Sequence, residues 1–277
     1  MQTQHFKECA RLSLRVPHAR IRAMNSVSRD LSENLARVRE RIELAATQSG
    51  RAPEEISLIA VSKTHPARKI QELYEAGVRH FGENRVQERE SKLVQLQGVA
   101  ATWHMIGHLQ KNKAARAVSL FSSIDTVDSI ALADKLDRAR ADLTTEGTEA
   151  TEERRGSIPG ASGNRLRVLI EVKLDPEPAK SGVADADLPG LIEAIQRLPH
   201  LDLQGLMGVP PYFADPEEAR LYFRRLRELR DTARKQFSRQ ILPVLSMGMS
   251  HDFDIAIQEG ATELRVGTAL FGTRESA

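Results

Sequence analysis

Short apolar runs alternate with amphipathic stretches along most of the chain, and this alternation constrains the fold more than any other feature. Eight runs have the length and content of buried strands: 57–62, 78–81, 102–106, 121–125, 167–172, 203–207, 243–246 and 262–266. Helical patterns lie between them, for example at 70–77, 129–140, 188–198 and 216–237. Strands and helices in this order predict an α/β protein with a single (β/α)8 TIM barrel. A doubly wound open sheet is the alternative, but no Gly-rich dinucleotide fingerprint follows any of the strands.

The N-terminal segment differs from the rest of the chain. Residues 1–23 hold five basic residues and one acid, Glu8, in a pattern that weakly resembles an organelle transit peptide. We interpret this segment as a disordered upstream extension or a misplaced start, and we assign 24–277 to the barrel domain. From Met24 onward, Ser28 or Asp30 is expected to cap a helix that Gly50 ends, with one apolar face made of Leu31, Leu35, Val38 and Ile42.

One connection between the expected elements is unusually polar. Residues 144–164 are rich in Thr, Glu, Gly and Ser and have almost no apolar content. A segment of this composition cannot bury enough surface to order itself. We therefore predict a flexible, disordered insertion at 144–164, on the face of the barrel opposite the usual active-site end.

Overall composition narrows the classes of protein to consider. The 277 residues have a net charge of +2 and 4% aromatic residues, which argues against nucleic-acid binding. The single Cys9 cannot form an internal disulfide, and no apolar run approaches the roughly 20 residues that span a membrane. We expect a cytoplasmic monomer that acts on neither membranes nor nucleic acids.

A lysine stands at the end of the first expected strand. In the stretch LIAVSKTHP, 58–66, Lys63 follows a buried-looking apolar run. Most lysines near strand ends only extend their ammonium group into water. Because catalytic groups of TIM barrels gather where the strands end, Lys63 also fits a functional role.

Two later segments are rich in hydrogen-bond donors at the positions where barrels often bind phosphate, after strands seven and eight. The first is SMGMSHD, with Ser246, Gly248 and Ser250, and the second is RVGTALFG, with Gly267 and Thr268. Backbone amides next to glycine approach phosphate closely, and hydroxyls add donors. Together the two segments predict a phosphate-bearing ligand. A lysine able to form a Schiff base beside such a site indicates pyridoxal 5′-phosphate (PLP).

The sequence resembles the pyridoxal phosphate homeostasis proteins, which are single-barrel relatives of the N-terminal domain of alanine racemase. The resemblance covers about 25–274 and rests on AVSKTHP, HFGENRVQE, WHMIGHLQKNKA, SIDTVDS, AKSG, GLMGVPP, LSMGMSHDFDIAI and LRVGTALFG. It implies Lys63 as the lysine that forms the aldimine and Arg265 as the partner of the pyridine nitrogen. It also implies Asn84 near the cofactor and phosphate contacts from Ser246, Ser250, Gly267 and Thr268. Lys173 and Lys111 depart from the usual pattern and leave the finer lining of the site, and the role of Lys180, open.

Two further candidates have competing structural explanations. His104, at the end of the third expected strand, either hydrogen-bonds the ligand or is a structural histidine that hydrogen-bonds to other groups of the protein. His251 with Asp252 and Asp254 resembles loose metal ligation, but Asp252 is placed to cap the following helix, so we predict no metal.

Three functions fit these residues. The first is a non-catalytic protein that holds PLP on Lys63 for vitamin B6 homeostasis and delivers it to apoenzymes. The second is a PLP-dependent amino-acid racemase. The third is a barrel enzyme in which Lys63 forms a Schiff base with a phosphorylated sugar. Arg265 favours the first over the second, because a permanent guanidinium opposes the protonated pyridine ring that racemisation uses. The chain also ends at Ala277, before the additional domain that supplies a catalytic tyrosine in alanine racemase.

Overall fold

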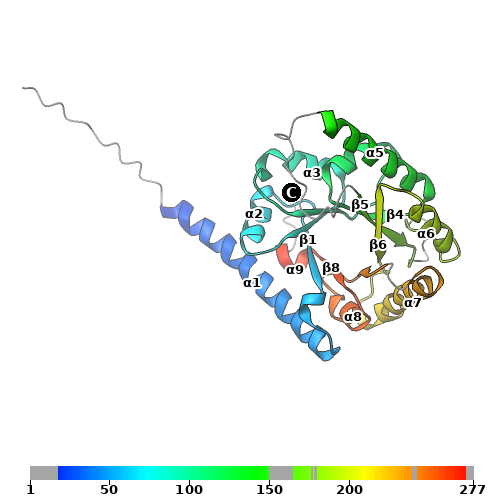
Figure 1. Ribbon diagram of the computed structural model, residues 1–277. Coiled ribbons are helices and arrows are strands. Elements are labelled where there is room, and N and C mark those ends of the chain that lie inside the picture. Colours follow the sequence, from blue (N-terminus) through cyan, green and yellow to red (C-terminus); the bar gives the residue numbers. More distant parts are fainter. Residues whose placement is uncertain (1–17, 150–164, 176, 178–179, 239–241, 273–277) are drawn as a thin grey trace, which may run out of the picture.

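The computed structural model describes residues 18–149, 165–175, 177, 180–238 and 242–272, with the backbone alone at 18–29 and 145–149. Within these residues, eight parallel strands close into a barrel in chain order (Figure 1). The strands are β1 (Ser57–Val61), β2 (His80–Glu83), β3 (Thr102–Met105), β4 (Ser123–Val127), β5 (Leu166–Val172), β6 (Leu201–Gly208), β7 (Val244–Ser246) and β8 (Glu263–Val266). The barrel closes where Ile59 of β1 pairs with Arg265 of β8. The predicted TIM barrel is therefore confirmed.

Helices surround the strands (Figure 1). They are α1 (His18–Gln48), α2 (Ala67–Glu75), α3 (Val86–Lys92), α4 (Ala114–Leu120), α5 (Ile130–Glu149), α6 (Leu188–Gln196), α7 (Arg220–Gln236), α8 (Phe253–Gln258) and α9 (Thr268–Phe271). Short 3-10 helices occur at Pro53–Glu55, Val94–Leu96, Lys111–Lys113 and Pro216–Ala219. In the part of the chain that is described, no helix is long and apolar enough to span a bilayer.

The strands are buried because the helices cover one side of them and the barrel interior covers the other. All five residues of β4 are buried, and Ile59 and Ala60 of β1 have no exposed surface. Such strands need apolar residues on both faces, which explains why the eight segments read as apolar runs without alternation.

Helix α1 covers the place where the barrel closes, since it packs against α2, α8 and α9. Its buried side chains include the predicted apolar face of Leu31, Leu35, Val38 and Ile42. Gly50 has a φ of 67°, as expected for a left-handed residue at a helix end.

Helix α1 begins earlier than predicted. It starts at His18, so Ser28 and Asp30 lie inside the helix and 18–23 belong to it. Ala, Arg and Met dominate the stretch after Pro17, and these residues favour a helix without any tertiary contact. The rest of the predicted extension, 1–17, lies outside the described residues.

Helix α5 is also longer than we predicted. It continues to Glu149, so 144–149 are helical although we expected them to belong to a disordered insertion. A polar composition does not end a helix by itself, because helical hydrogen bonds form within the segment. Residues 150–164 of the predicted insertion lie outside the described part of the chain.

Two strands begin two residues later than predicted. We placed β2 at 78–81 and β4 at 121–125, and the strands are His80–Glu83 and Ser123–Val127. Val78 and Phe121 are buried in the turns that lead into these strands. The apolar residues thus predicted burial correctly, but they predicted the start of each of these two strands two residues too early.

Candidate functional site

Lys63 lies in a tight turn at the carboxyl end of β1, as the sequence predicts. The N–H of His65 donates to the carbonyl oxygen of Ser62 at 3.1 Å, so Lys63 and Thr64 occupy the two central positions of a β-turn. Thr64 has a φ of 67°, a left-handed conformation that costs a threonine on the order of 1 kcal/mol. The side chain of Lys63 is half-buried.

The turn that carries Lys63 lies beside the loop that follows β8. The ring of His65 stacks on Phe271 of α9 with 4.4 Å between the ring centroids. A Cβ atom on Gly267 would lie 3.5 Å from the carbonyl oxygen of Val61. The first and last strands therefore bring Lys63 close to the second of the two predicted phosphate loops.

The two predicted phosphate loops meet at Ser250. Its Oγ accepts hydrogen bonds from the backbone N–H groups of Gly267 at 3.2 Å and Ala269 at 3.1 Å. Thr268 lies between them, with an exposed side chain at the start of α9. Two amides and two hydroxyls thus gather at one place, and this donor set is suited to a phosphate group.

The loop after β7 depends on Gly248 and Asp252. Gly248 has a φ of 91°, and a Cβ atom there would lie 2.6 Å from the side chain of Ala256. The side chain of Asp252 accepts from the N–H of Met249 at 2.6 Å and makes no capping bond to α8. Asp252 therefore stands at the predicted N-cap position of α8, but its carboxylate stabilises the preceding loop instead of the helix end.

Arg265 extends from β8 into the barrel interior. Its Nη1 donates to Ser246 Oγ at 2.7 Å, and its Nη2 donates to the carbonyl of Gly208, at the end of β6, at 2.8 Å. Burial lowers the pKa of Arg265, and the nearby acids Asp125 and Glu171 oppose this effect. Ser246, predicted to contact phosphate, is fully buried and holds the guanidinium group.

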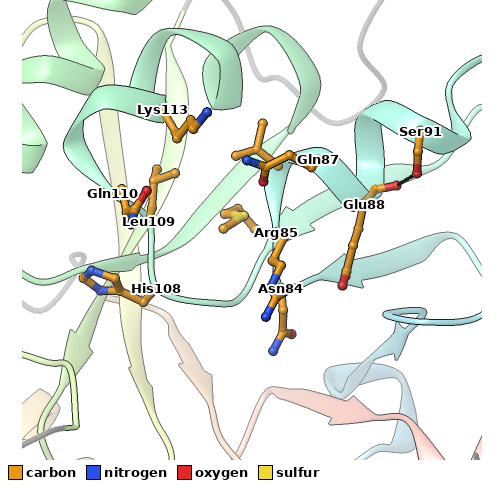
Figure 2. Close-up of a pocket in the computed structure, with 11 residues that line it drawn as sticks. Asn84, Arg85, Gln87, Glu88, Ser91, His108, Leu109, Gln110 and Lys113 are labelled. Atoms are coloured by element: carbon orange, nitrogen blue, oxygen red, sulfur yellow. Dashed lines mark hydrogen bonds between the residues drawn. The ribbon is translucent and has the colours of Figure 1, made fainter.

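Asn84 follows β2 directly and borders a pocket of about 560 Å³ between the loops after β2 and β3. Figure 2 shows Lys113 and Gln110 on one side of this pocket, Gln87 on the other, and Asn84 near its end. A Cβ atom on Gly107 would lie 2.3 Å from the carbonyl oxygen of Asn84, so glycine is required for the two loops to approach. Since β2 pairs with β1, Asn84 and Lys63 follow neighbouring strands of the barrel.

His104 lies elsewhere, in a buried polar network inside the barrel. Its Nε2 lies 3.0 Å from His80 Nδ1, and its Nδ1 lies 2.9 Å from Asp125 Oδ2. Arg167 donates to Glu263 Oε1 at 2.5 Å and lies 3.6 Å from Asp125. These contacts favour the structural role of the two that we considered for His104.

The network joins residues from different levels of the barrel: His80 and Glu263 begin β2 and β8, whereas His104 is the third of the four residues of β3. His104, Asp125 and Glu263 have potential metal-ligand atoms within 4.8 Å of one another. Both acids pair with Arg167, so the guanidinium already supplies a positive charge between them. Burial, together with the charges of His104 and Arg167, lowers the pKa of His80 to about 4.

Two buried acids lie at the carboxyl ends of strands: from the sequence we ranked Glu83 below Asn84 as a ligand, and we missed Glu171. Glu83, at the end of β2, accepts from Ser62 Oγ and from Lys92 Nζ, each at 2.7 Å. Glu171, near the end of β5, accepts from Ser181 Oγ at 3.2 Å, and burial raises its pKa. The signal was an acid within or directly after an apolar strand, as in VLIEV and HFGE.

The remaining candidates lie at the surface. Lys180 is exposed and lies 3.7 Å from the exposed Glu177. His251 is exposed, lies 3.3 Å from the carbonyl oxygen of Ala214 and stacks on Tyr212, which is 81% exposed. A solvated charge therefore describes Lys180 well.

The closed barrel, with a lysine at the end of β1 and donor-rich loops after β7 and β8, is an alanine racemase-like barrel. The family model described as the alanine racemase N-terminal domain matches residues 33–275. An alanine racemase from Clostridium difficile shares the fold with a TM-score of 0.60 at 16% identity, over 89% of this chain and 57% of that chain.

Closer relatives specify the family. A pyridoxal phosphate homeostasis protein of Aquifex aeolicus is 40% identical over 245 residues, which cover 88% of this chain and 98% of the relative. The Escherichia coli K12 protein of the same name is 38% identical over 89% of this chain and 97% of its own length. PipY of Synechococcus elongatus, solved with PLP bound, matches with a TM-score of 0.71 at 38% identity, over 87% of this chain and 100% of PipY. The chain belongs to the family of pyridoxal phosphate homeostasis proteins.

Proposed function

We propose that this protein binds PLP reversibly, as a Schiff base on Lys63, and serves vitamin B6 homeostasis without catalytic turnover. The observation that carries the proposal is the convergence of Ser250 Oγ with the N–H groups of Gly267 and Ala269 beside the turn of Lys63. Bound PLP supplies an aldehyde for the lysine and a phosphate for these donors. PLP in the related PipY structure supports the same ligand here.

Each predicted residue has a role in this proposal. Lys63 forms the covalent link, and Ser250, Gly267 and Thr268 hold the phosphate. Arg265 faces the pyridine nitrogen, with Ser246 and the carbonyl of Gly208 fixing its guanidinium group. Asn84 borders the cofactor from the neighbouring strand. We leave His104 out, because its two ring nitrogens already lie within hydrogen-bond distance of His80 and Asp125.

Arg265 favours a role in binding PLP over a role in catalysis. A buried guanidinium beside the pyridine nitrogen opposes ring protonation, and an unprotonated ring is a weaker acceptor of electrons from a substrate carbanion. PLP bound beside Arg265 still reacts with amines, but it is poorly suited to support removal of an α-proton from a substrate. We infer release to apoenzymes as the use of the bound PLP, and a cytoplasmic monomer as its form.

The second candidate is an amino-acid racemase, and Glu171 is the observation in its favour. This carboxyl group is buried near the end of β5, one of its oxygens has no hydrogen-bond partner among the described residues, and burial raises its pKa. A racemase needs an acid–base group on each face of the bound substrate. Glu171 and Lys63 are the pair to test for that function.

The decisive experiment is borohydride reduction of the PLP-loaded protein, followed by peptide mass spectrometry. We expect the pyridoxyl mass on the peptide that contains Lys63. Label on Lys111 or Lys180 would refute the assignment, and no label after loading would favour a cofactor-free barrel enzyme.

A further inference from the structure

A buried ionic group ties the end of β1 to the end of β2. Lys92, at the end of α3, donates from Nζ to Glu83 Oε1 at 2.7 Å and to the carbonyl oxygen of Ser62 at 2.9 Å. The hydroxyl of Ser62 donates to the same Glu83 oxygen at 2.7 Å. All three residues are buried. One ammonium group therefore connects three elements of the barrel.

The carbonyl of Ser62 is also the acceptor that closes the turn around Lys63. It receives the N–H of His65 at 3.1 Å as well as the ammonium of Lys92. The turn contains Thr64 in a left-handed conformation, which persists only where the surroundings enforce it. The bond from Lys92 supplies such a constraint, because it fixes the carbonyl on which the turn is built.

Glu83 links the same ammonium to Asn84, the residue that directly follows β2 and that the proposed function places beside the cofactor. Burial raises the pKa of Glu83, whereas Lys92 and Ser62 lower it, and the carboxyl of Glu88 raises it. The cation of Arg89 also faces this group from α3. Lys92 thus supplies a direct hydrogen bond to the carboxylate of Glu83 and, together with Arg89, balances its buried charge.

We propose that Lys92 is a positioning residue for the binding site: it holds the strained turn in the geometry that presents Lys63, and it sets the end of β1 against Asn84. The inference rests on the proposed function for the identity of the ligand. The hold on the turn itself is a property of the cofactor-free protein and is measurable without PLP.

The variants are chosen to separate positioning from folding. Lys92→Met alone leaves Glu83 buried without its ion-pair partner at 2.7 Å, so it destabilises the fold. Glu83→Gln with Lys92→Met removes both charges and keeps an acceptor for the hydroxyl of Ser62, so it restores most of the lost stability. It does not restore the bond to the carbonyl of Ser62. Lys69→Met, at a half-buried lysine of α2, is the matched control.

Cofactor binding is the first measurement. We expect the double variant to bind PLP about ten- to a hundredfold more weakly than the wild type, which corresponds to one lost hydrogen bond to a charged group. Adding Thr64→Gly should recover affinity, because glycine adopts the left-handed turn position without strain. A double variant that regains both stability and PLP affinity would show that Lys92 only balances a charge, and the proposal would fail.

Amide hydrogen exchange of the cofactor-free protein is the second measurement. In the double variant, the N–H of His65 should exchange at least about tenfold faster, while amides of β3 keep their wild-type rates. An unchanged rate at His65 would overturn the proposal whatever the affinity for PLP. Faster exchange in a protein whose wild type binds no PLP would support the hold on the turn and refute the proposed function instead.

Discussion

At the scale of single residues, the candidate site separates covalent attachment from phosphate binding. Lys63 stands on a turn whose closing carbonyl, that of Ser62, accepts from His65 and Lys92, while Ser250 joins two loops that follow other strands. Arg265 and Ser246 form a third part, fixed by hydrogen bonds inside the barrel. These parts make separate contacts, so substitutions in each should have distinguishable effects.

Ser250→Ala and Thr268→Val should each weaken PLP retention. Loss of one hydrogen bond to a charged phosphate costs roughly 1.5 to 3 kcal/mol, or about ten- to a hundredfold in affinity. Equilibrium dialysis of PLP measures the change, with Ser119→Ala on the exposed side of α4 as the control. Wild-type affinity in both variants would remove these loops from the phosphate site.

Glu171→Gln should change how stability depends on pH. Burial raises the pKa of Glu171 above its usual 4.5, so the folded protein holds this proton more tightly than the unfolded chain. Its contribution to stability is therefore complete below pH 4.5 and is lost as pH rises through the folded-state pKa. Urea unfolding should show that the free energy of unfolding of the variant rises relative to that of the wild type as pH increases through this window. A constant difference would mean that Glu171 is ionised throughout.

At the scale of elements, α1 contributes stability through one face only. Leu35 is 2% exposed against the barrel, whereas Leu44 on the same helix is 58% exposed. Leu35→Ala should lower the free energy of unfolding by about 2 to 5 kcal/mol, and Leu44→Ala by less than about 0.5 kcal/mol. Urea denaturation compares the two, and equal effects would contradict this view of the helix.

At this scale, strands could be predicted from the sequence because each one is a short run of consecutive apolar residues. Runs such as LIAV and VLIEV identify strands, and the position of Lys63 after β1 follows from the first of them. Contacts between strands were not predictable, because they depend on register. His80, His104, Asp125, Arg167 and Glu263 come from five strands and meet only once the barrel has closed. Lys92 reads as an ordinary surface lysine until α3 is placed beside Ser62.

At the scale of the whole molecule, the buried network makes the barrel sensitive to acid. The pKa of His80 falls from 6.5 to about 4, so the folded state disfavours its charged form. Stability from neutral His80 is complete above pH 6.5 and is lost as pH falls toward 4, by at most roughly 3 kcal/mol. His80→Gln should flatten this part of the pH profile in urea unfolding. A parallel profile would show that other groups cause the acid sensitivity.

The protein as a whole should bind amino acids at the cofactor without turning them over. Arg265 disfavours the protonated ring that α-proton removal uses. Deuterium incorporation at the α-carbon of alanine in D₂O, with PLP-loaded protein first in excess and then in catalytic amounts, measures hidden exchange. Multiple turnovers that disappear in both Lys63→Ala and Glu171→Gln would establish a racemase.

The meeting of the first and last strands also bears on how the protein is made. Lys63 follows β1 and Thr268 follows β8, so the two halves of the candidate site are separated by almost the whole barrel sequence. The stacking of His65 on Phe271 and the closure of β1 on β8 require both ends to be present. If the proposed function holds, a nascent chain on the ribosome exposes the lysine that forms the Schiff base long before it has phosphate donors. Tight capture of the ligand begins only after the last strand has been synthesised and has closed the ring.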